Sequence, residues 1–424
     1  MKKTLGLLLG LSISLFISAQ NELEKSFDRG DFIKINQLLD KGDFTNENMD
    51  EIYYHLVKAY TYNAMNNYTE SNDNLRFLLE KEESREYPHA MIVILSLKAN
   101  NHARLFDYHN AANTYKEIID NYADILGEQI SGVKESLRMY NILKGIKPLS
   151  VSIKGTQIPM IRNPKGYLEV EVQTSSKEPV LLVFDTGAGF SSVTESAARE
   201  MNLKILADSF QVSGSTNNLE YTKIAVADQL QMGNMMYENV IFQVLKDELL
   251  EVPEENIKIK GVLGFHEISA LPAMKIYNKT NILEILPAKK HSESSNMMFT
   301  RDWQMIVSAN DSLLFFLDTG AAWSSLSLNY YNNNKDDIEN TGTSSTKLVR
   351  GMGGSKEFPI YSLTDFPVKI NTFTTILPEI PVFVQPKSAN QNEYDGILGQ
   401  DIINQYDYML LDFKNMYFSL GNIE

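Results

Sequence analysis

Cysteine is absent from the 424-residue sequence. Its absence excludes a disulfide framework, a thiolate nucleophile and any metal site built on cysteine ligands. Excess positive charge is also lacking, because the formal net charge is −15. A chain this acidic, without a basic patch, is not expected to bind nucleic acid or an anionic membrane surface. Packed hydrophobic cores must therefore stabilise the folded chain.

Long hydrophobic runs are missing except at the N-terminus, which reads MKKTLGLLLGLSISLFISAQ. Two lysines precede an apolar stretch of about 13 residues, shorter than the roughly 20 that span a bilayer. Small residues follow at Ser18 and Ala19, and this order is typical of a secretory signal peptide. We expect residues 1–19 to be removed and the mature protein to be periplasmic or secreted, without a stable membrane anchor. An uncleaved anchor is the alternative.

Several catalytic motifs are missing as well. No Gly-x-Ser-x-Gly segment offers a serine nucleophile. His266 stands in GFHEISA, but Ala270 occupies the place of the second histidine of a zinc-protease motif. GMGGSK lacks the spacing of a phosphate-binding loop, and the other histidines show no ligand spacing. We therefore expect no metal and no cofactor, and we interpret His266 as a surface or core residue.

Proline and glycine are scarce between residues 21 and 147, where apolar residues recur at helical spacing. This pattern predicts an all-helical domain. Two stretches in it look alike, NNYTESNDNLRFLL from Asn66 and FDYHNAANTYKEII from Phe106, about 40 residues apart. They loosely resemble tetratricopeptide repeats, whose period is about 34 residues. We expect this region to bind a protein partner or to recruit substrate.

From residue 148 onward the sequence turns to β-branched alternation with glycine and proline, which predicts strands. This part is internally duplicated: LVFDTGAGFSS around Asp185 returns as FFLDTGAAWSS around Asp318, an offset of 318 − 185 = 133. Each copy is followed at nearly the same interval by a similar segment, KGVLGFHEI and then DGILGQDII. The polar stretch 287–296 separates the copies. We therefore expect a first lobe over 148–288 and a second over 296–424.

These paired motifs resemble those of the aspartic peptidases, in which two lobes each give one Asp-Thr-Gly to a shared site. Alanine after the glycine in both copies makes the lobes look like the retroviral type. The resemblance implies a mainly-β, bilobed fold of retropepsin/pepsin type, here a single-chain pseudo-dimer, with Asp185 and Asp318 as the catalytic pair. It also implies that the neighbouring residues support this pair and lock the two loops together: Thr186, Gly187, Ala188, Thr319, Gly320 and Ala321.

Two carboxylates about 3 Å apart share one proton, because like charges so close cannot both ionise. Such a pair removes a proton from water and donates one to the carbonyl oxygen of a peptide bond. In pepsin-type sites, a serine or threonine after the glycine stabilises the ionised carboxylate. Ala188 and Ala321 cannot do so, and we expect pKa values for the pair above those of pepsin, with activity reaching toward neutral pH.

A peptide or protein substrate is expected to bind as an extended strand under a flap. The candidate flaps are 212–224 and 349–361, and an ordinary exposed hairpin is the alternative for each. Glycines would allow their turns and an aromatic residue would line the cleft; the candidates are Gly214, Gly351, Gly353, Gly354, Tyr221 and Phe358.

The sequence thus predicts an exported aspartic endopeptidase with a helical N-terminal domain. Two other interpretations stay open. The cleft could bind peptides without cleaving them, with the helical domain as the main interaction surface. Alternatively, the helical domain could cover the cleft until the segment 147–163 is cut.

Overall fold

The computed structural model describes residues 19–42, 49–176, 178–213, 219–252, 257–351, 354–386 and 393–423. The chain divides into two compact units, Met1–Pro148 and Leu149–Glu424, and each is described by itself. The predicted signal peptide, apart from Ala19, lies outside the described residues. Within the described ranges, no helix is both long and apolar enough to cross a membrane.

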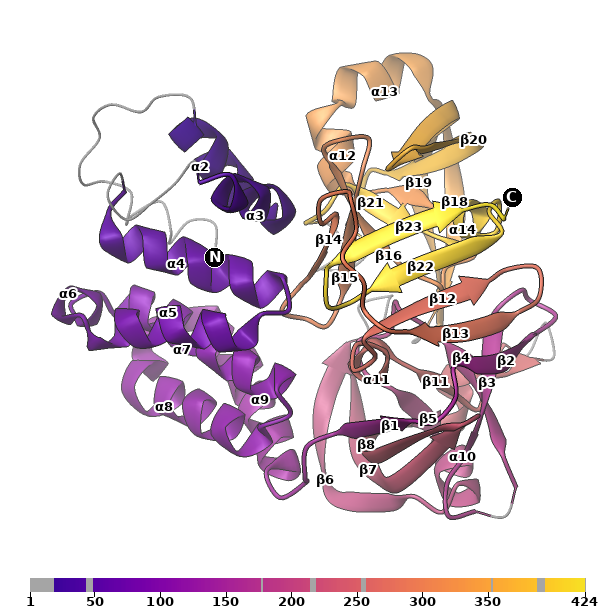
Figure 1. The fold of residues 1–424 in the computed structure, drawn as a ribbon, viewed down its shortest axis with the longest axis horizontal. Helices are drawn as coiled ribbons and strands as arrows, with labels where there is room; N and C mark the ends of the chain where they lie inside the picture. The colour runs from indigo at the N-terminus through magenta and orange to yellow at the C-terminus, as the bar shows by residue number, and fades with distance from the viewer. Residues whose placement is uncertain are drawn as a thin grey trace. The chain divides into compact units, whose positions relative to one another are not determined.

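Helical hairpins build the first unit, drawn in indigo and purple in Figure 1. Three hairpins follow one another in the described part of the chain, and a short helix and a final helix complete the unit. The bounds are α2 (Ala19–Arg29) with α3 (Phe32–Asp40), α4 (Glu51–Ala64) with α5 (Tyr68–Glu80), α6 (Glu82–Arg85), α7 (Pro88–Arg104) with α8 (Tyr108–Leu126), and α9 (Ile130–Leu143).

The three hairpins share one turn geometry. Each passes through a residue of positive φ: Gly30 at 68°, Asn66 at 62° and Phe106 at 58°. The Asp or Asn that follows donates its backbone N–H to a carbonyl near the end of the preceding helix, at 2.8 Å in all three turns. An aromatic residue comes next and begins the second helix. The similar stretches found in the sequence are the second and third of these turns, and the first was not recognised.

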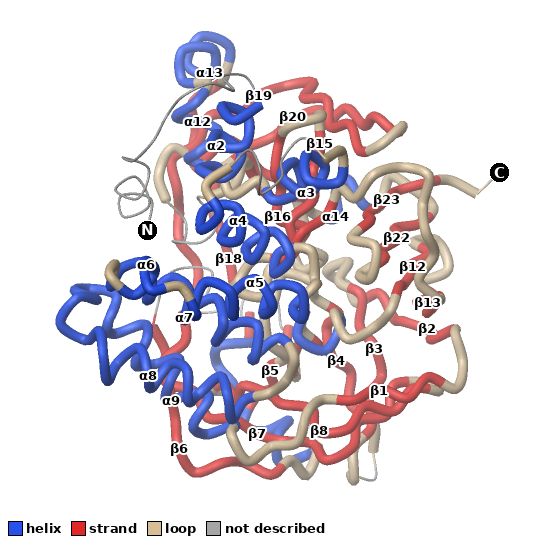
Figure 2. The backbone as a smooth tube through the Cα atoms, turned by 60° about the vertical axis from the view of Figure 1, so that its left-hand side comes forward, coloured by secondary structure: helices blue, strands red, loops and turns tan. Residues whose placement is uncertain are grey.

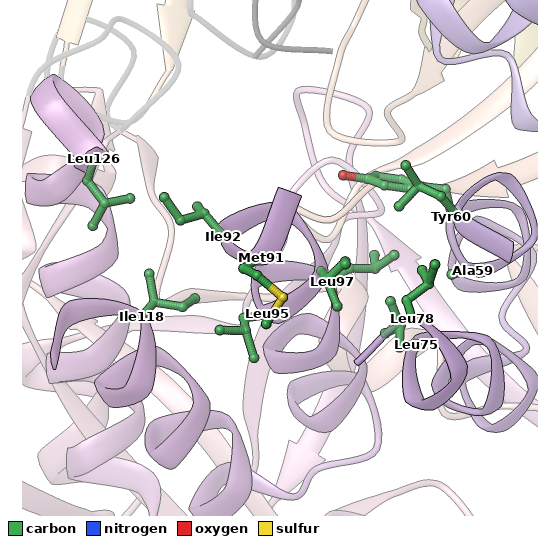
Figure 3. Close-up of a cluster of buried hydrophobic side chains, with 12 residues drawn as sticks. Ala59, Tyr60, Leu75, Leu78, Met91, Ile92, Leu95, Leu97, Ile118 and Leu126 are labelled. Carbon is green, nitrogen blue, oxygen red and sulfur yellow. The ribbon is translucent and has the colours of Figure 1, made fainter. Parts of the chain in front are cut away.

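The larger core of this unit lies between α4, α5, α7 and α8. Figure 3 shows its apolar side chains, among them Tyr60, Leu78, Leu95 and Ile118. A buried polar network also connects two of these helices. Asn63 Nδ2 donates to Asn100 Oδ1 at 2.9 Å and to Asn101 Oδ1 at 2.7 Å. Buried polar groups are stable only when paired, so these bonds fix α4 against α7.

The first lobe of the second unit is built on a mixed β-sheet. Figure 2 shows β6, β7 and β8 running alongside one another, as their antiparallel pairing requires. The elements are β1 (Ser150–Ile153), β2 (Gln157–Arg162), β3 (Leu168–Gln173), β4 (Val180–Phe184), β5 (Ser192–Thr194), α10 (Glu195–Glu200), β6 (Lys204–Ser213), β7 (Leu219–Met232), β8 (Met235–Leu245), β9 (Glu251–Val252), β10 (Ile257–Lys258), β11 (Gly261–Leu263), α11 (Phe265–Ile268), β12 (Ala273–Tyr277) and β13 (Ile282–Leu286).

The second lobe repeats this plan in an eight-stranded sheet, counted over the described residues, while its last two strands extend the sheet of the first lobe. Its elements are β14 (Met297–Phe299), β15 (Met305–Ala309), β16 (Leu313–Leu317), β17 (Ser325–Leu326), α12 (Leu328–Asn333), α13 (Lys335–Thr341), β18 (Thr343–Gly351), β19 (Gly354–Ile370), β20 (Phe373–Phe383), β21 (Gly396–Leu398), α14 (Gln400–Ile403), β22 (Tyr408–Asp412) and β23 (Tyr417–Gly421).

Strand pairing joins the two lobes. β12 of the first lobe pairs antiparallel with β22 near the C-terminus, from Ala273 opposite Asp412 to Tyr277 opposite Tyr408. The strand order β23-β22-β12-β13 therefore takes strands from both lobes (Figure 1). Because these strands share backbone hydrogen bonds, the lobes form one continuous structure.

Parallel strand pairs place the duplicated motifs in equivalent positions. β4 pairs parallel with β11, with Val183 opposite Val262, and β16 pairs parallel with β21, with Phe316 opposite Ile397. The interiors of these strands are buried, which explains their near-continuous apolar sequence. The predicted fold class, a helical domain followed by a mainly-β bilobed unit, is confirmed.

Candidate active site

Asp185 and Asp318 each lie where a buried strand ends. The backbone N–H of Asp185 donates to Leu263 O, and that of Asp318 donates to Leu398 O, both at 3.0 Å. Each acid is therefore held by the glycine motif that follows it in sequence in its own lobe. This repeated arrangement explains why an apolar strand runs directly into an acid and a glycine turn at two places.

Two buried threonines lock the acid loops to each other. The N–H of Thr186 donates to Thr319 Oγ1 at 3.0 Å, and the N–H of Thr319 donates to Thr186 Oγ1 at 3.1 Å. Each hydroxyl donates onward across the lobe junction, from Thr186 to Leu317 O at 2.9 Å and from Thr319 to Phe184 O at 3.0 Å. Since every donor in this network has a partner, the relative position of the loops is tightly defined.

The glycines bring backbone donors up to the carboxylates. Gly187 N donates to Asp185 Oδ1 at 2.7 Å, and Gly320 N donates to Asp318 Oδ1 at 2.8 Å. Gly320 N also lies 3.1 Å from Asp185 Oδ1, so one N–H is shared between the carboxylates of the two lobes. A Cβ atom at Gly187 would lie 2.3 Å from Asp318 Oδ1, and one at Gly320 would lie 2.5 Å from Asp185 Oδ2. Only glycine therefore fits at either position.

The environment of Asp185 favours its protonated form. Burial raises the pKa of Asp185 above its ordinary value, although hydrogen bonds from Gly187, from the Asp318 side chain and from Gly320 and Ala188 act in the opposite direction. Asp318 is therefore one of the groups that set the pKa of Asp185. Acids that interact this closely titrate as a pair rather than one by one.

Ala188 and Ala321 anchor each loop through their backbone. Ala188 O accepts from Phe265 N at 2.7 Å, and Ala321 O accepts from Gln400 N at 2.9 Å. These bonds tie each acid loop to the short helix after the second glycine motif. A methyl group at either position offers no hydroxyl to the neighbouring carboxylate.

A serine behind each loop was not identified from the sequence. Ser191 Oγ accepts from Gly264 N at 2.9 Å and donates to Glu267, while Ser324 Oγ accepts from Gly399 N at 2.9 Å and donates to Asp401 Oδ1 at 2.6 Å. All four links are inside their lobes and position the acid loop against the glycine motif. The Ser-Ser doublet after both motifs was the available signal.

His266 lies in the core of the first lobe, one of the two places expected for it. Its side chain is fully buried, with Nδ1 2.7 Å from Glu267 Oε1 and its ring packed against those of Phe190 and Trp303, which also contact each other. Among the described residues, no group of three or more His, Asp or Glu side chains could hold a metal ion.

A contact between the lobes also reaches the second acid loop. Arg162 Nη1 donates to Gln400 Oε1 at 3.2 Å, and Gln400 Nε2 donates to Thr319 O at 2.7 Å. The guanidinium group of Arg162 in the first lobe is therefore connected to the Asp318 loop of the second lobe by hydrogen bonds through Gln400.

The candidate flaps are antiparallel hairpins. Pairing of β6 with β7 extends to Ser213 opposite Leu219, and that of β18 with β19 extends to Gly351 opposite Gly354. Two of the predicted turn glycines, Gly214 and Gly353, lie outside the described residues.

The two aromatic residues expected to line the cleft need correction. Phe358 is 1% exposed and packs in the core of the second lobe with Ile360 and Phe383. Tyr221 is 62% exposed, but it pairs with Gln211 on the face opposite the buried pair of Phe210 and Thr222. The first side chain is needed for packing, and the second points away from the inner face of its hairpin.

Comparisons with known proteins match parts of this chain. Residues 170–266 match the family model described as aspartyl protease. Two solved structures are similar to the chain. A retropepsin-like aspartic protease from Rickettsia conorii shares 16% identity over 33% of this chain and 96% of that chain, with a TM-score of 0.23. EIAV protease complexed with the inhibitor HBY-793 shares 24% identity over 28% of this chain and 92% of that chain, with a TM-score of 0.18.

No curated protein matches the chain by sequence. The family match confirms the predicted resemblance to the aspartic peptidases over residues 170–266 of the first lobe. The second lobe carries the same Asp-Thr-Gly-Ala residues in the same setting. The match over residues 170–266 supports a hydrolase of the aspartic peptidase type.

Proposed function

We propose that the protein is an exported aspartic endopeptidase that uses Asp185 and Asp318 as its catalytic dyad. The observation that carries this proposal is the Gly320 N–H, which lies 2.8 Å from Asp318 Oδ1 and 3.1 Å from Asp185 Oδ1 and so holds one carboxylate of each lobe together. The threonine network fixes the two loops around this point.

The chemistry follows from one proton shared by two carboxyl groups. The ionised carboxylate takes a proton from water as the water oxygen attacks the carbonyl carbon of the peptide bond. The protonated partner gives its proton to the carbonyl oxygen, and a neutral tetrahedral diol forms. The acid that took the water proton then donates it to the nitrogen, and the other carboxylate takes a proton from one hydroxyl of the diol. The C–N bond breaks, one carboxylic acid and one amine leave, and the pair again holds one proton. No step needs a group beyond the two acids and water.

Substrate would bind as an extended strand between the dyad and the hairpins, with main-chain hydrogen bonds supplying affinity. The helical unit would recruit a protein partner or the substrate itself. Its three equivalent hairpins support that role, because stacked helical hairpins present extended surfaces for protein binding.

The direct test is to incubate the mature full-length protein with a diverse peptide mixture from pH 3 to pH 8 and identify the products by mass spectrometry. Internal cleavage of peptides supports an endopeptidase, and trimming of ends alone contradicts that part of the proposal. A second form carries an inserted protease site between Lys147 and Pro148. Activity that appears only after this site is cut indicates inhibition by the helical unit. Absence of cleavage in both forms contradicts the proposal and favours peptide binding without hydrolysis.

The pH dependence yields a separate prediction about Ala321. Because burial raises the pKa of Asp185, the dyad keeps its shared proton to higher pH, and the alkaline limb of the activity profile moves upward. Ala321→Ser would add a hydroxyl donor that favours the ionised pair. We expect the alkaline limb to fall by about one pH unit, since a charge-assisted hydrogen bond is worth about 1.5 kcal/mol or more.

The matched control for this prediction is Ala322→Ser, the same change at the next, exposed position. Profiles of kcat/KM against pH should coincide for this variant and the wild type. If Ala321→Ser leaves the alkaline limb unmoved, the methyl group is not what sets the pH range.

A further inference from the structure

The inner face of the β18–β19 hairpin carries two lysines. Residues opposite each other in an antiparallel pair project to the same face, and Lys347 is opposite Phe358 while Val349 is opposite Lys356. Phe358 is buried, so this face is the one directed at the lobe. Leu348, on the other face, is 43% exposed. On the inner face, Phe358 is therefore part of the core. Lys347 lies opposite Phe358, and Val349 and Lys356 form the next pair on this face toward the turn.

Trp323 lies beneath this face, in the segment that follows the Asp318 loop. Its ring is partly exposed, stacks on Phe383 with centroids 6.1 Å apart, and packs against the cluster that contains Phe358. Lys347 Nζ is 4.9 Å from the centroid of the Trp323 ring, and Lys356 Nζ is 5.0 Å from that of Phe358. Each ammonium group thus lies over an aromatic ring. Lys347 lies over Trp323, which follows the Asp318 loop in sequence, and Lys356 lies over the buried Phe358.

The charge of these lysines is not neutralised within the described protein. Neither Lys347 nor Lys356 forms an ion pair with a carboxylate of the described residues. They also belong to a chain of net charge −15, which repels acidic peptides in general. Because exposed charges are screened beyond about 8 Å at physiological salt, a nearby acidic side chain responds to these lysines more than to the distant surface.

The corresponding hairpin of the first lobe has no such cations on its inner face. There the paired positions are Phe210 and Thr222, both buried, and Val212 comes next on the same face. Lys223 is exposed and pairs with Ser209 on the opposite face. The two halves of the cleft thus differ in charge, which distinguishes one end of a bound peptide from the other.

We propose that Trp323, Lys347 and Lys356 form a specificity subsite of the second lobe that takes an acidic side chain, aspartate or glutamate, of the substrate peptide. This inference rests on the proposed peptidase function. The carboxylate would contact the ammonium groups, while its methylenes would lie on the Trp323 ring. The subsite belongs to one side of the scissile bond only, because the first lobe lacks its counterpart.

The test compares peptides that differ only by Glu or Gln at each position in turn, with kcat/KM measured for every pair. For the wild type we expect one position at which Glu is preferred by about threefold to tenfold, in line with a partly exposed charge pair. The preference should fall at high salt. In the double variant Lys347→Glu with Lys356→Glu, we expect Gln and Lys to be preferred at that position instead.

Two further variants make the result specific. Lys223→Glu makes the same substitution at a single lysine on the outer face of the first-lobe hairpin, and it should keep the Glu preference. The milder Lys347→Gln, checked by circular dichroism for its fold, should weaken the preference if the double variant fails to fold. A wild type that shows no Glu preference at any position, or a preference that survives loss of both lysines, overturns the proposal.

Binding of the same peptides to Asp185→Asn separates this inference from the proposed function. If the wild type does not cleave but the variant binds Glu peptides more tightly through Lys347, the subsite stands and the peptidase assignment fails. If the wild type cleaves without preference, the subsite is wrong and the peptidase assignment stands. If no peptide is cleaved and none binds, both are wrong.

Discussion

Replacing Asp185 or Asp318 by asparagine is expected to lower kcat for peptide cleavage by about 10³- to 10⁴-fold, because each change removes one partner of the proposed general acid–base pair. An amide cannot share a proton as a carboxyl group does, so neither variant contains an acid and a base at the same time. The loops should keep their positions, since the threonine network between Thr186 and Thr319 does not involve the carboxylates. Steady-state kinetics and near-ultraviolet circular dichroism measure the two effects.

The control for this pair of variants is Asp311→Asn, which neutralises an exposed acid of the second lobe. Its kcat should equal that of the wild type. A dyad variant that keeps more than about a tenth of wild-type kcat would show that its carboxylate is not one of the two catalytic groups.

Gly320→Ala is expected to lower kcat by about 100-fold or more with both aspartates in place. The added methyl would lie 2.5 Å from Asp185 Oδ2, closer than atoms can approach, and must displace that carboxylate. A misplacement of about 1 Å at a catalytic group costs roughly 10² in rate. Overpacking also costs typically 1–3 kcal/mol of stability, so the melting temperature should fall. Gly187→Ala should act alike, because its methyl would meet Asp318.

Gly132→Ala serves as the matched control for the glycine variants. Gly132 lies within α9, and an added Cβ there meets no atom within 4 Å. Alanine favours a helix over glycine by about 1 kcal/mol, so this variant should be fully active and slightly more stable. Equal kcat values for Gly320→Ala and the wild type would contradict the close approach of the two loops.

The duplicated motif made the fold of the β unit predictable. Strand pairing within each lobe follows from the apolar run before each acid and the glycine segment after it, which pair as parallel strands in both lobes. The contact of Arg162 with Gln400 could not be foreseen, because 238 residues separate them and no pattern links an arginine before one motif to a glutamine after the other.

The acidic partners of the serines behind the acid loops could not be predicted by aligning the two copies of the motif. Ser191 and Ser324 occupy equivalent positions, but their acidic partners do not, since Glu267 and Asp401 stand at different distances from Gly264 and Gly399. The faces of the first hairpin were not predicted. Thr222 is buried and the neighbouring Tyr221 is exposed, which reverses the order that hydrophobicity suggests.

In the helical unit, the turn at Gly30 was missed because its sequence differs from the other two. Glycine, asparagine and phenylalanine occupy the same positive-φ position in the three turns, and phenylalanine is seldom found there. The three turns therefore cannot be recognised as repeats from their residue types, although the backbone hydrogen bond is the same in each turn.

One chain is proposed to build one catalytic site from its two lobes, and a mixing experiment tests this most directly. Peptide cleavage is measured for the wild type, for Asp185→Asn, for Asp318→Asn, and for an equimolar mixture of the two variants over a range of dilutions. We predict that the wild type cleaves at a rate proportional to its concentration and that both variants and their mixture stay inactive. Recovery of activity in the mixture, or cleavage by either variant alone at the wild-type rate, would contradict the account.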